Sequence, residues 1–225
     1  VGKNRGTITT DNGIIIQADE FEFDKVINIL KAKGNVTIED KLNNYNFFAK
    51  AITYFKNEEK IEIQGKTEAM IGDDYNFKTE NISIFREQMI ISSDVGVEIL
   101  DNKNQTLYEI GKFSYSLNDE ILKGEDFFIN TKYNQPFSDK YFFKNAVFNL
   151  KDQTYIAQDI NINFKKDIFG NENNDPRFKG TSSSSKNGVT TINKGIFTSC
   201  KKNNGCPPWT IQADKIIYDK NKKQI

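Results

Sequence analysis

The only two cysteines of the chain, Cys200 and Cys206, lie close together near its C-terminal end, and the only tryptophan, Trp209, follows them. Cysteine can ligate a metal, attack a substrate or form a disulfide. The sequence contains no histidine, the usual general base and a common metal ligand. Ser-His-Asp and Cys-His catalysis are therefore excluded, and two cysteines alone do not complete a zinc site. We predict a protein that is not an enzyme, with no catalytic residue, metal or cofactor.

The cysteine spacing favours a disulfide. The loop between Cys200 and Cys206 is short enough for disulfide geometry. A chain that carries no other cysteine agrees with an oxidising compartment, where a stray thiol is a liability. We expect Cys200 and Cys206 to pair with each other, or one of them to pair with a cysteine beyond this chain. A thiolate activated by Lys201 or Lys202 is the weaker alternative.

The charged residues indicate no further chemistry. Lys+Arg and Asp+Glu both number 31, so the formal net charge is zero, and no basic stripe suggests a nucleic-acid partner. Acidic pairs such as Asp73-Asp74 and Glu58-Glu59 fall at expected turns, where Asp is favoured for its geometry. No run approaches the roughly 18 apolar residues of a transmembrane helix. Because Val1 is not an initiator Met and Ile225 lies inside an apparent hairpin, we expect a piece of a longer protein.

The elements that position these residues are predicted to be β-strands throughout. Short runs of Phe, Ile, Tyr, Val and Thr alternate with polar residues and are separated by Asn, Asp, Lys and Gly. An apolar-x-apolar signature starts at residues 21, 52, 82 and 113, with weaker copies at 146 and 216. A period near thirty indicates stacked strand units that share one continuous core. The sequence therefore predicts an all-β protein.

The side chains of each signature should share one face of their strand. Stacking the units would align them in an apolar column, which is either an ordinary dry core or the lining of a groove for a lipid. The candidate groove residues are Phe21, Phe23, Ile52, Tyr54, Ile82, Ile84, Phe113, Tyr115, Ala146 and Phe148.

The spacing of the strand signatures divides the chain into three parts. Residues 1–165 form the repeat domain. Residues 166–193, which include a run of four serines from Ser182 to Ser185, are expected to be a flexible polar insertion. Residues 194–225 resume the strands and carry the cysteine-containing loop.

The segment from Gly195 to Cys200, together with Cys206-Pro207-Pro208-Trp209 and the run from Ile211 to Asp219, resembles the lipopolysaccharide-assembly outer-membrane family LptD, also called organic solvent tolerance protein (OstA). The stretch from Asn174 to Gly180 also fits, and it is similar to the alphaproteobacterial members. The upstream repeats resemble the periplasmic OstA-like module that the family shares with the bridge protein LptA. The resemblance covers essentially the whole chain, and its specific part is the Cys-Pro-Pro-Trp segment.

The resemblance implies an open, twisted β-jellyroll of stacked antiparallel strands that carries the acyl chains of lipopolysaccharide at the periplasmic face of the outer membrane. It also implies that an LptA-like bridge protein joins by β-strand addition. A plug lipoprotein would act on a transmembrane barrel that this chain lacks. In the family, the cysteine that matches Cys200 pairs with the C-terminal end of that barrel, whereas Cys206 here offers a local partner.

Three alternatives stay open. A free-standing LptA-like bridge protein would have the same repeats but no reason for the Cys-Pro-Pro-Trp segment. A β-solenoid polysaccharide-active enzyme would need carboxylates that converge at one level of the stack. A structural stalk would have a closed, dry core without a groove.

Overall fold

The computed structural model describes residues 4–10, 13–135, 138–170, 173–202 and 207–225. Their regular structure is strands and two short 3-10 helices, and the strand pairs are antiparallel. The predicted all-β class with antiparallel strands is confirmed, whereas the β-solenoid alternative requires parallel strands. No helix in the described part of the chain has the length and hydrophobicity that a membrane crossing requires.

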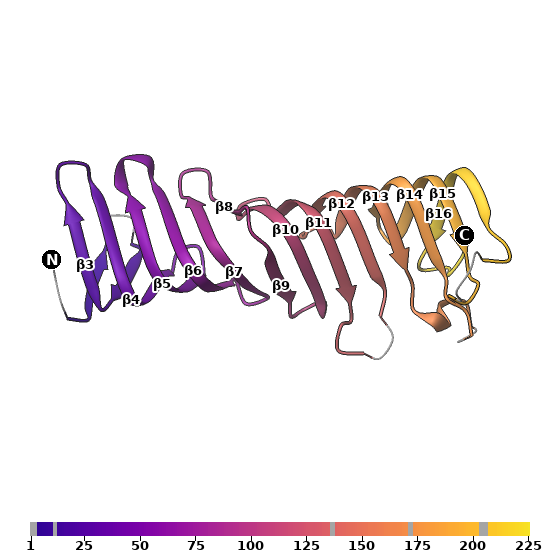
Figure 1. Ribbon diagram of the computed structural model, residues 1–225, viewed down its shortest axis with the longest axis horizontal. Helices are drawn as coiled ribbons and strands as arrows, with labels where there is room; N and C mark the ends of the chain where they lie inside the picture. The colour runs from indigo at the N-terminus through magenta and orange to yellow at the C-terminus, as the bar shows by residue number, and fades with distance from the viewer. Residues whose placement is uncertain (1–3, 11–12, 136–137, 171–172, 203–206) are drawn as a thin grey trace. The chain divides into compact units, whose positions relative to one another are not determined.

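The chain forms two compact units, Val1–Lys103 with Gly111–Asn118, and Asn104–Ile110 with Asp119–Ile225 (Figure 1). The first contains β1 (Gly6–Thr9), β2 (Ile15–Ala18), β3 (Glu20–Asp24), β4 (Ile29–Asp40), β5 (Tyr45–Phe55), η1 (Lys56–Glu58), β6 (Lys60–Ile71), β7 (Tyr75–Phe85), β8 (Ile90–Ser93), β9 (Val97–Asp101) and the second part of β10 (Thr106–Ser116). The second contains the first part of β10 and then β11 (Ile121–Thr131), β12 (Lys140–Asn149), β13 (Thr154–Asn163), η2 (Lys166–Phe169), β14 (Arg177–Lys186), β15 (Val189–Thr198) and β16 (Ile211–Asp219).

Each strand pairs mainly with its neighbour along the chain. In the first unit the hydrogen-bonded order is β1-β2-β4-β5-β6-β7-β8-β10, with β3 on β4 and β9 on β7. In the second unit the order runs from β11 to β16 without a crossover. The period of about thirty residues is therefore one pair of neighbouring antiparallel strands.

Tight turns join the strands, and aspartate starts several of them. The carboxylate of Asp40 accepts hydrogen bonds from the backbone N–H groups of Leu42 and Asn43, both at 3.0 Å. Asn44 follows with a positive φ of 51° and leads into β5. Asp24 and Asp219 begin equivalent turns. The Asp and Asn residues between strands are thus turn residues, as their chemistry predicts.

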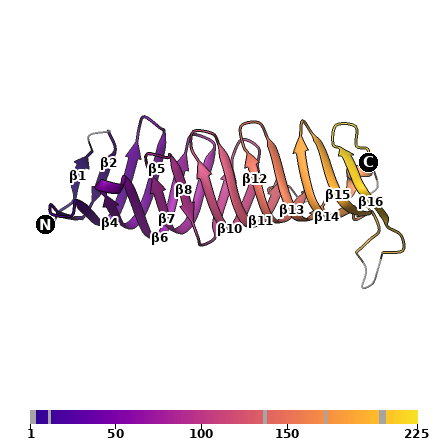
Figure 2. The same cartoon turned by 90° about the horizontal axis from the view of Figure 1, so that it is seen from above.

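The long strands bend at a crease near their middle (Figure 2). In most of them, such as β5, β7 and β12, the alternation of buried side chains shifts by one residue there, whereas β4 and β6 keep the alternation and have a register shift of the ladder at that level. In β7 the buried residues are Phe77 and Thr79 before the crease and Ile82 after it. Asn81 lies between them with a φ of 57°. The left-handed backbone at Asn81 lets one strand keep buried side chains on two differently oriented arms. We define the crease of each strand by this shift or, in β4 and β6, by the register shift of the ladder.

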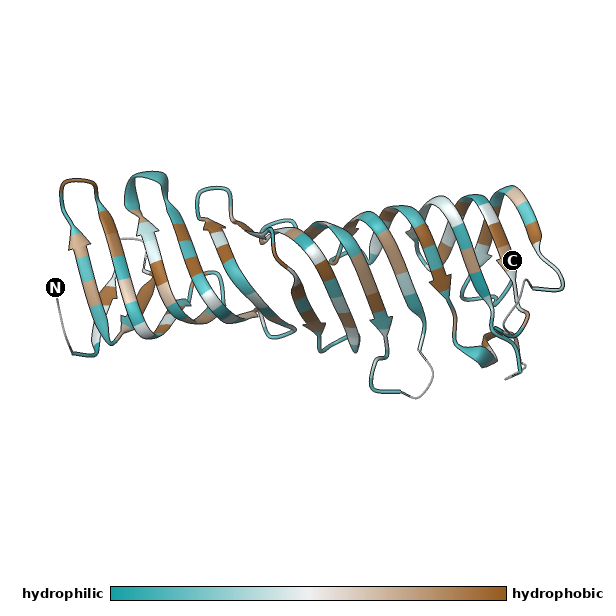
Figure 3. Ribbon diagram, viewed as in Figure 1, coloured by the Kyte–Doolittle hydropathy of each residue, from teal (hydrophilic) through white to brown (hydrophobic). Residues whose placement is uncertain are grey.

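The two arms of the strands form two walls in each unit, and both walls bury one face. We call the wall that carries the apolar-x-apolar signature the repeat wall, and the other the opposite wall. In the first unit one row of the repeat wall is Leu30, Tyr54, Ile61, Ile84, Ile91 and Tyr115, and the opposite wall includes Ile16, Ile38, Phe47, Ala69, Phe77 and Ile99. Figure 3 shows the resulting alternation of hydrophobic and hydrophilic residues along the strands.

The crease of the second unit carries paired charges on its exposed side. Asp126 and Lys144 face each other where β11 and β12 skip one residue pair, and Lys144 Nζ lies 2.6 Å from Asp126 Oδ1. The hydrogen bond and charge of Asp126, with Glu125 and Asp159 nearby, raise the pKa of Lys144. Because these side chains are exposed, the pair contributes little to stability.

The structure differs from the sequence expectation at residues 166–193. This segment was expected to be a flexible polar insertion, but it contains β14 and the beginning of β15, both paired over their length. The main-chain hydrogen bonds of a strand do not depend on apolar side chains, so a serine-rich segment between two paired strands can complete the sheet. Long strands also replace the short ones that the signatures suggested.

Asp40→Asn tests the turns. Burial alone would raise the pKa of Asp40, but hydrogen bonds from Asn43, Tyr45 and Leu42 outweigh it and hold that pKa below its ordinary value of 3.8. The ionised carboxylate therefore stabilises the fold fully above pH 3.8, and this contribution is lost as pH falls through the lower folded-state pKa. We expect the variant to lose about 1 kcal/mol at neutral pH. Urea unfolding in increasingly acidic buffers should show the two proteins converging, and a pH-independent difference would contradict this.

Gly65→Ala tests the crease. Gly65 has a φ of +81°, and its added Cβ would meet only Lys50 Cβ, at 3.9 Å. A decrease in the free energy of unfolding of Gly65→Ala therefore reports backbone strain and not a steric clash. We expect this decrease to be about 1–2 kcal/mol. Asp159→Gly, at a φ of 49° in β13, is the matched control and should change little. Equal losses at both positions in denaturant unfolding would show that left-handed backbone does not shape the crease.

Candidate functional site

The candidate site is the layer of side chains that face inward between the two walls. Eight of the ten predicted groove residues are buried there, with exposed fractions from 1% to 8%. They are Ile52, Tyr54, Ile82, Ile84, Phe113, Tyr115, Ala146 and Phe148. Phe21 is half-buried, and Phe23, one position from the end of β3, is 48% exposed. All ten lie on the repeat wall, because the signature marks that arm of the strands.

The opposite wall supplies the other side of the layer, and none of its residues was predicted from the sequence. In the second unit one of its rows runs across six neighbouring strands. This row is Ile129, Tyr141, Ile162, Phe178, Phe197 and Ile211. The signal was present as a second alternation within most of the long strands, shifted by one residue at the crease, as in β5 and β7. In the sequence alone, a break in the alternation looks like the end of one strand and the start of another.

The walls of the first unit touch through aromatic rings. The ring of Phe77 on the opposite wall lies 6.1 Å from that of Phe113 and 5.7 Å from that of Tyr115 on the repeat wall. Both distances are within the usual range for interacting aromatic pairs. The apolar faces of the two walls therefore pack against each other at this level.

The second unit has a denser aromatic layer around Phe148. Its ring lies 5.4 Å from that of Phe127, 6.0 Å from that of Tyr108 and 6.1 Å from that of Phe143. Tyr155, next to Phe148 on the repeat wall, lies 5.2 Å from the rings of both Phe148 and Phe143. Phe148 is thus the centre of the packing between the walls of this unit.

A polar network holds the rim of the first unit's layer. The guanidinium of Arg86 donates to the Tyr54 hydroxyl at 2.7 Å and to Glu59 at 2.5 Å, and the Tyr54 hydroxyl donates to Glu59 at 2.8 Å. Burial and the hydrogen bond to Glu59 raise the pKa of Tyr54 to about 12, although Arg86 opposes the shift. This network fixes the ring of Tyr54, one of the predicted groove residues, at the edge of the apolar layer.

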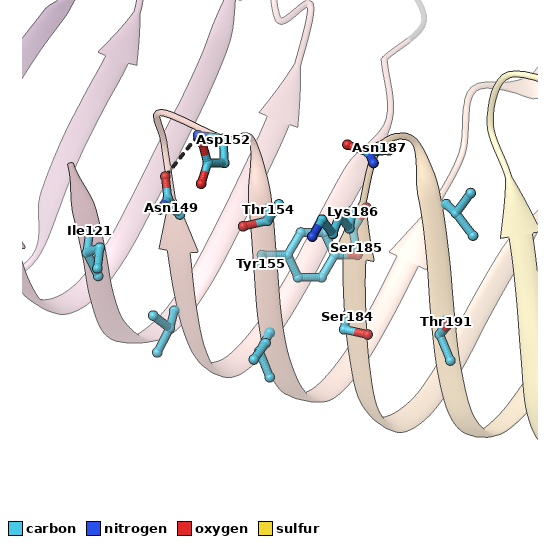
Figure 4. Close-up of a pocket in the computed structure, with 13 residues that line it drawn as sticks. Ile121, Asn149, Asp152, Thr154, Tyr155, Ser184, Ser185, Lys186, Asn187 and Thr191 are labelled. Carbon is cyan, nitrogen blue, oxygen red and sulfur yellow. Dashed lines mark hydrogen bonds between the residues drawn. The ribbon is translucent and has the colours of Figure 1, made fainter. Parts of the chain in front are cut away.

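A depression of about 850 Å³ lies over the strands of the second unit (Figure 4). Its lining includes Val147, Ile156 and Ser184, which alternate with the buried residues of the repeat wall and therefore face outward. Val147 is 42% and Ile156 68% exposed. The depression therefore opens mainly on the outward face, although Tyr155 and Ser185 of the repeat wall also line it (Figure 4). Its lining carries polar groups without a paired-carboxylate or thiol arrangement in the described part of the chain.

The cysteine–tryptophan segment is attached to the end of β15. The hydroxyl of Thr198 donates to the carbonyl oxygen of Trp209 at 2.9 Å, and the rings of Trp209 and Phe197 lie 5.9 Å apart. Arg177 donates to the carbonyl oxygen of Cys200 at 2.6 Å. Cys206 lies outside the described residues, so the pairing of Cys200 and Cys206 stays a prediction.

The chain is similar to solved structures. The chain resembles LptH from Pseudomonas aeruginosa, described as the LptA-homologous periplasmic component of the lipopolysaccharide transport device. The identity is 17% and the TM-score 0.46, over 51% of this chain and 83% of LptH. No protein-family model matches the chain, and neither does any curated protein.

Phe148→Ala tests whether the inward layer holds the walls together. The change removes ring contacts to both walls at a buried position, so we expect the free energy of unfolding to fall by about 3–5 kcal/mol. Phe142→Ala is the control on the same strand, because Phe142 is 38% exposed and contacts Phe128 at 4.9 Å. In denaturant unfolding, Phe142→Ala should lower the free energy of unfolding much less than Phe148→Ala. A comparable loss for both variants would mean that the inward layer is not the stabilising core.

Proposed function

We propose that the protein holds the acyl chains of lipopolysaccharide between its two walls and passes the lipid from a periplasmic bridge toward an outer-membrane translocon, as an LptD-like periplasmic domain. The observation that carries this proposal is the apolar inward layer, in which matched rows continue from strand to strand within each unit. Such a layer offers a lipid repeated, equivalent contacts rather than one deep pocket. The proposed location is the periplasmic face of the outer membrane.

Although the walls touch, the free energy gained by burying an acyl chain exceeds the cost of separating an aromatic pair between them. Each methylene removed from water contributes roughly 0.8 kcal/mol, so a chain of about twelve methylenes gains on the order of 10 kcal/mol. Separation of an aromatic pair such as Phe77 and Phe113 costs about 0.5–1.5 kcal/mol beyond its burial. An acyl chain between the walls would also keep the separated rings out of water. A lipid can therefore replace contacts between the walls.

Open strand edges support a docking role for an LptA-like bridge partner. In the described part of the chain, β16 pairs along its length with β15 alone, and β1 pairs with β2 alone. An exposed edge can accept a strand of another protein through main-chain hydrogen bonds. The sequence resemblance at the Cys-Pro-Pro-Trp segment is what favours an LptD-like domain over a free-standing bridge protein.

A structural stalk is the competing function, and the contacts between walls favour it. Rings from both walls meet in each unit, as a closed, dry core would require. The two proposals differ in whether the walls separate for a ligand. An experiment that asks what contacts the inward side chains in cells distinguishes them.

Photo-crosslinking provides this test. We expect a benzophenone side chain at Ile52 or at Phe113 to form lipopolysaccharide adducts in cells, because both positions are buried in the inward layer. Thr53 and Ser114, the next residues on the same strands, face the other side and serve as matched controls. Adducts are detected by a mobility shift with lipopolysaccharide antibodies. Two outcomes would contradict lipid binding and favour the structural stalk. One is adducts at the control positions only, and the other is no adduct at any of the four positions in folded protein.

A further inference from the structure

A group of hydroxyls interrupts the apolar layer of the second unit. One inward row of the repeat wall crosses six neighbouring strands, from β11 to β16. Its members are Leu122, Phe148, Tyr155, Ser185, Thr190 and Tyr218. The row beside it contains Ser183, between Ala157 and Ile192. We call Tyr155, Ser183, Ser185, Thr190 and Tyr218 the hydroxyl cluster.

The cluster departs from the repeat at one strand. The positions that carry Ala146 and Phe148 in β12, and Ile216 and Tyr218 in β16, carry Ser183 and Ser185 in β14. Other copies of the signature are apolar or tyrosine at both positions. Ser183 has an exposed fraction of 2%, so its hydroxyl is not placed there for contact with solvent.

Three oxygens of the cluster are buried without a hydrogen-bond partner among the described residues. They are the phenol oxygens of Tyr155 and Tyr218 and the hydroxyl oxygen of Ser183. Burial raises the pKa of Tyr155, and weak hydrogen bonding of its phenol with Ser183 and Thr190 opposes the rise. Neither contact meets the distance and angle of a full hydrogen bond, and the Thr190 hydroxyl instead donates to Ser185 at 3.2 Å. An unpartnered buried hydroxyl costs about 1–3 kcal/mol, so a protein interior rarely retains several together.

The opposite wall completes an amphipathic enclosure around these oxygens. Tyr141 lies on the opposite wall, between Ile129 and Ile162. Its pKa is raised mainly by burial, and Asp139, Tyr155 and Tyr218 are close enough to add to the rise. Phe164 lies beside it, with its ring 4.8 Å from that of Tyr218 and 6.4 Å from that of Tyr141. The surroundings are thus aromatic, and the unsatisfied groups are neutral hydroxyls.

We propose that the hydroxyl cluster is a subsite for an oxygen atom carried on an acyl chain, so that the second unit prefers oxygenated chains to plain hydrocarbon. Hydroxyls both donate and accept, which matches a hydroxyl or carbonyl group. A free ion is a poor fit, because the unsatisfied oxygens are uncharged and apolar rings surround them. This inference rests on the proposed function and specifies its ligand.

Binding of two fatty acids that differ by one hydroxyl tests the subsite. We expect the full chain to bind β-hydroxymyristate about three- to tenfold more tightly than myristate, measured by displacement of a fluorescent fatty acid. Tyr218→Phe and Ser183→Ala each remove an oxygen without a partner. Both should abolish this preference without lowering the midpoint of urea unfolding. Ser184→Ala, at the adjacent exposed position in β14, is the matched control and should keep the preference.

The outcomes separate the two proposals. Equal binding of both fatty acids, or a preference that survives in Tyr218→Phe and Ser183→Ala, overturns the subsite while acyl binding stands. This is the result expected if the oxygens hold buried water only. Loss of the preference in Ser184→Ala also overturns the assignment. Binding of neither fatty acid overturns the subsite and the lipid-binding function together.

Discussion

The two-walled architecture of each unit depends on the crease, where several strands carry a left-handed residue. A strand with regular alternation buries one face of one wall. In β7 the shift between Thr79 and Ile82, with Asn81 at positive φ, gives the same strand a second buried face. Gly65 in β6 and Asp159 in β13 have the same backbone conformation at their creases. The inward layer and its aromatic contacts follow from the crease, which β5, β10, β12 and β14 form without a left-handed residue.

The sequence predicted the repeat wall because its residues follow a simple rule. Pairs such as Ile82 and Ile84 are two residues apart, are β-branched, and recur with the period of a strand pair. The crease was not predictable in the same way. Several of its residues are Asn, Asp or Lys, which are equally typical of turns, so Asp126 and Lys194 resembled the ends of strands. The opposite wall was missed as a consequence.

The serine-rich strand β14 shows that composition alone does not predict which segments form strands. Ser182 to Ser185 have the composition of a linker, which predicts an insertion there. The neighbours β13 and β15 supply the main-chain partners that make β14 a strand. Its side chains then alternate inward and outward as in any strand, and Ser183 is buried where the repeat has apolar residues. A polar interior of this kind depends on tertiary pairing, which one sequence does not reveal.

Pairing between chain neighbours also determines how the protein would evolve and how it would lose structure. Within the second unit, each strand from β12 to β15 contacts the strand before it and the strand after it, with no crossover. Duplication or deletion of a strand pair therefore changes the length of the unit while both walls and the crease keep their geometry. In such an arrangement the stability is approximately a sum of contacts between neighbouring strands, and a terminal strand has a neighbour on one side only. Unfolding therefore starts at the terminal strands. Amide hydrogen exchange would then be fastest at β16 and slow progressively toward the interior strands, a gradient that a globular core does not show.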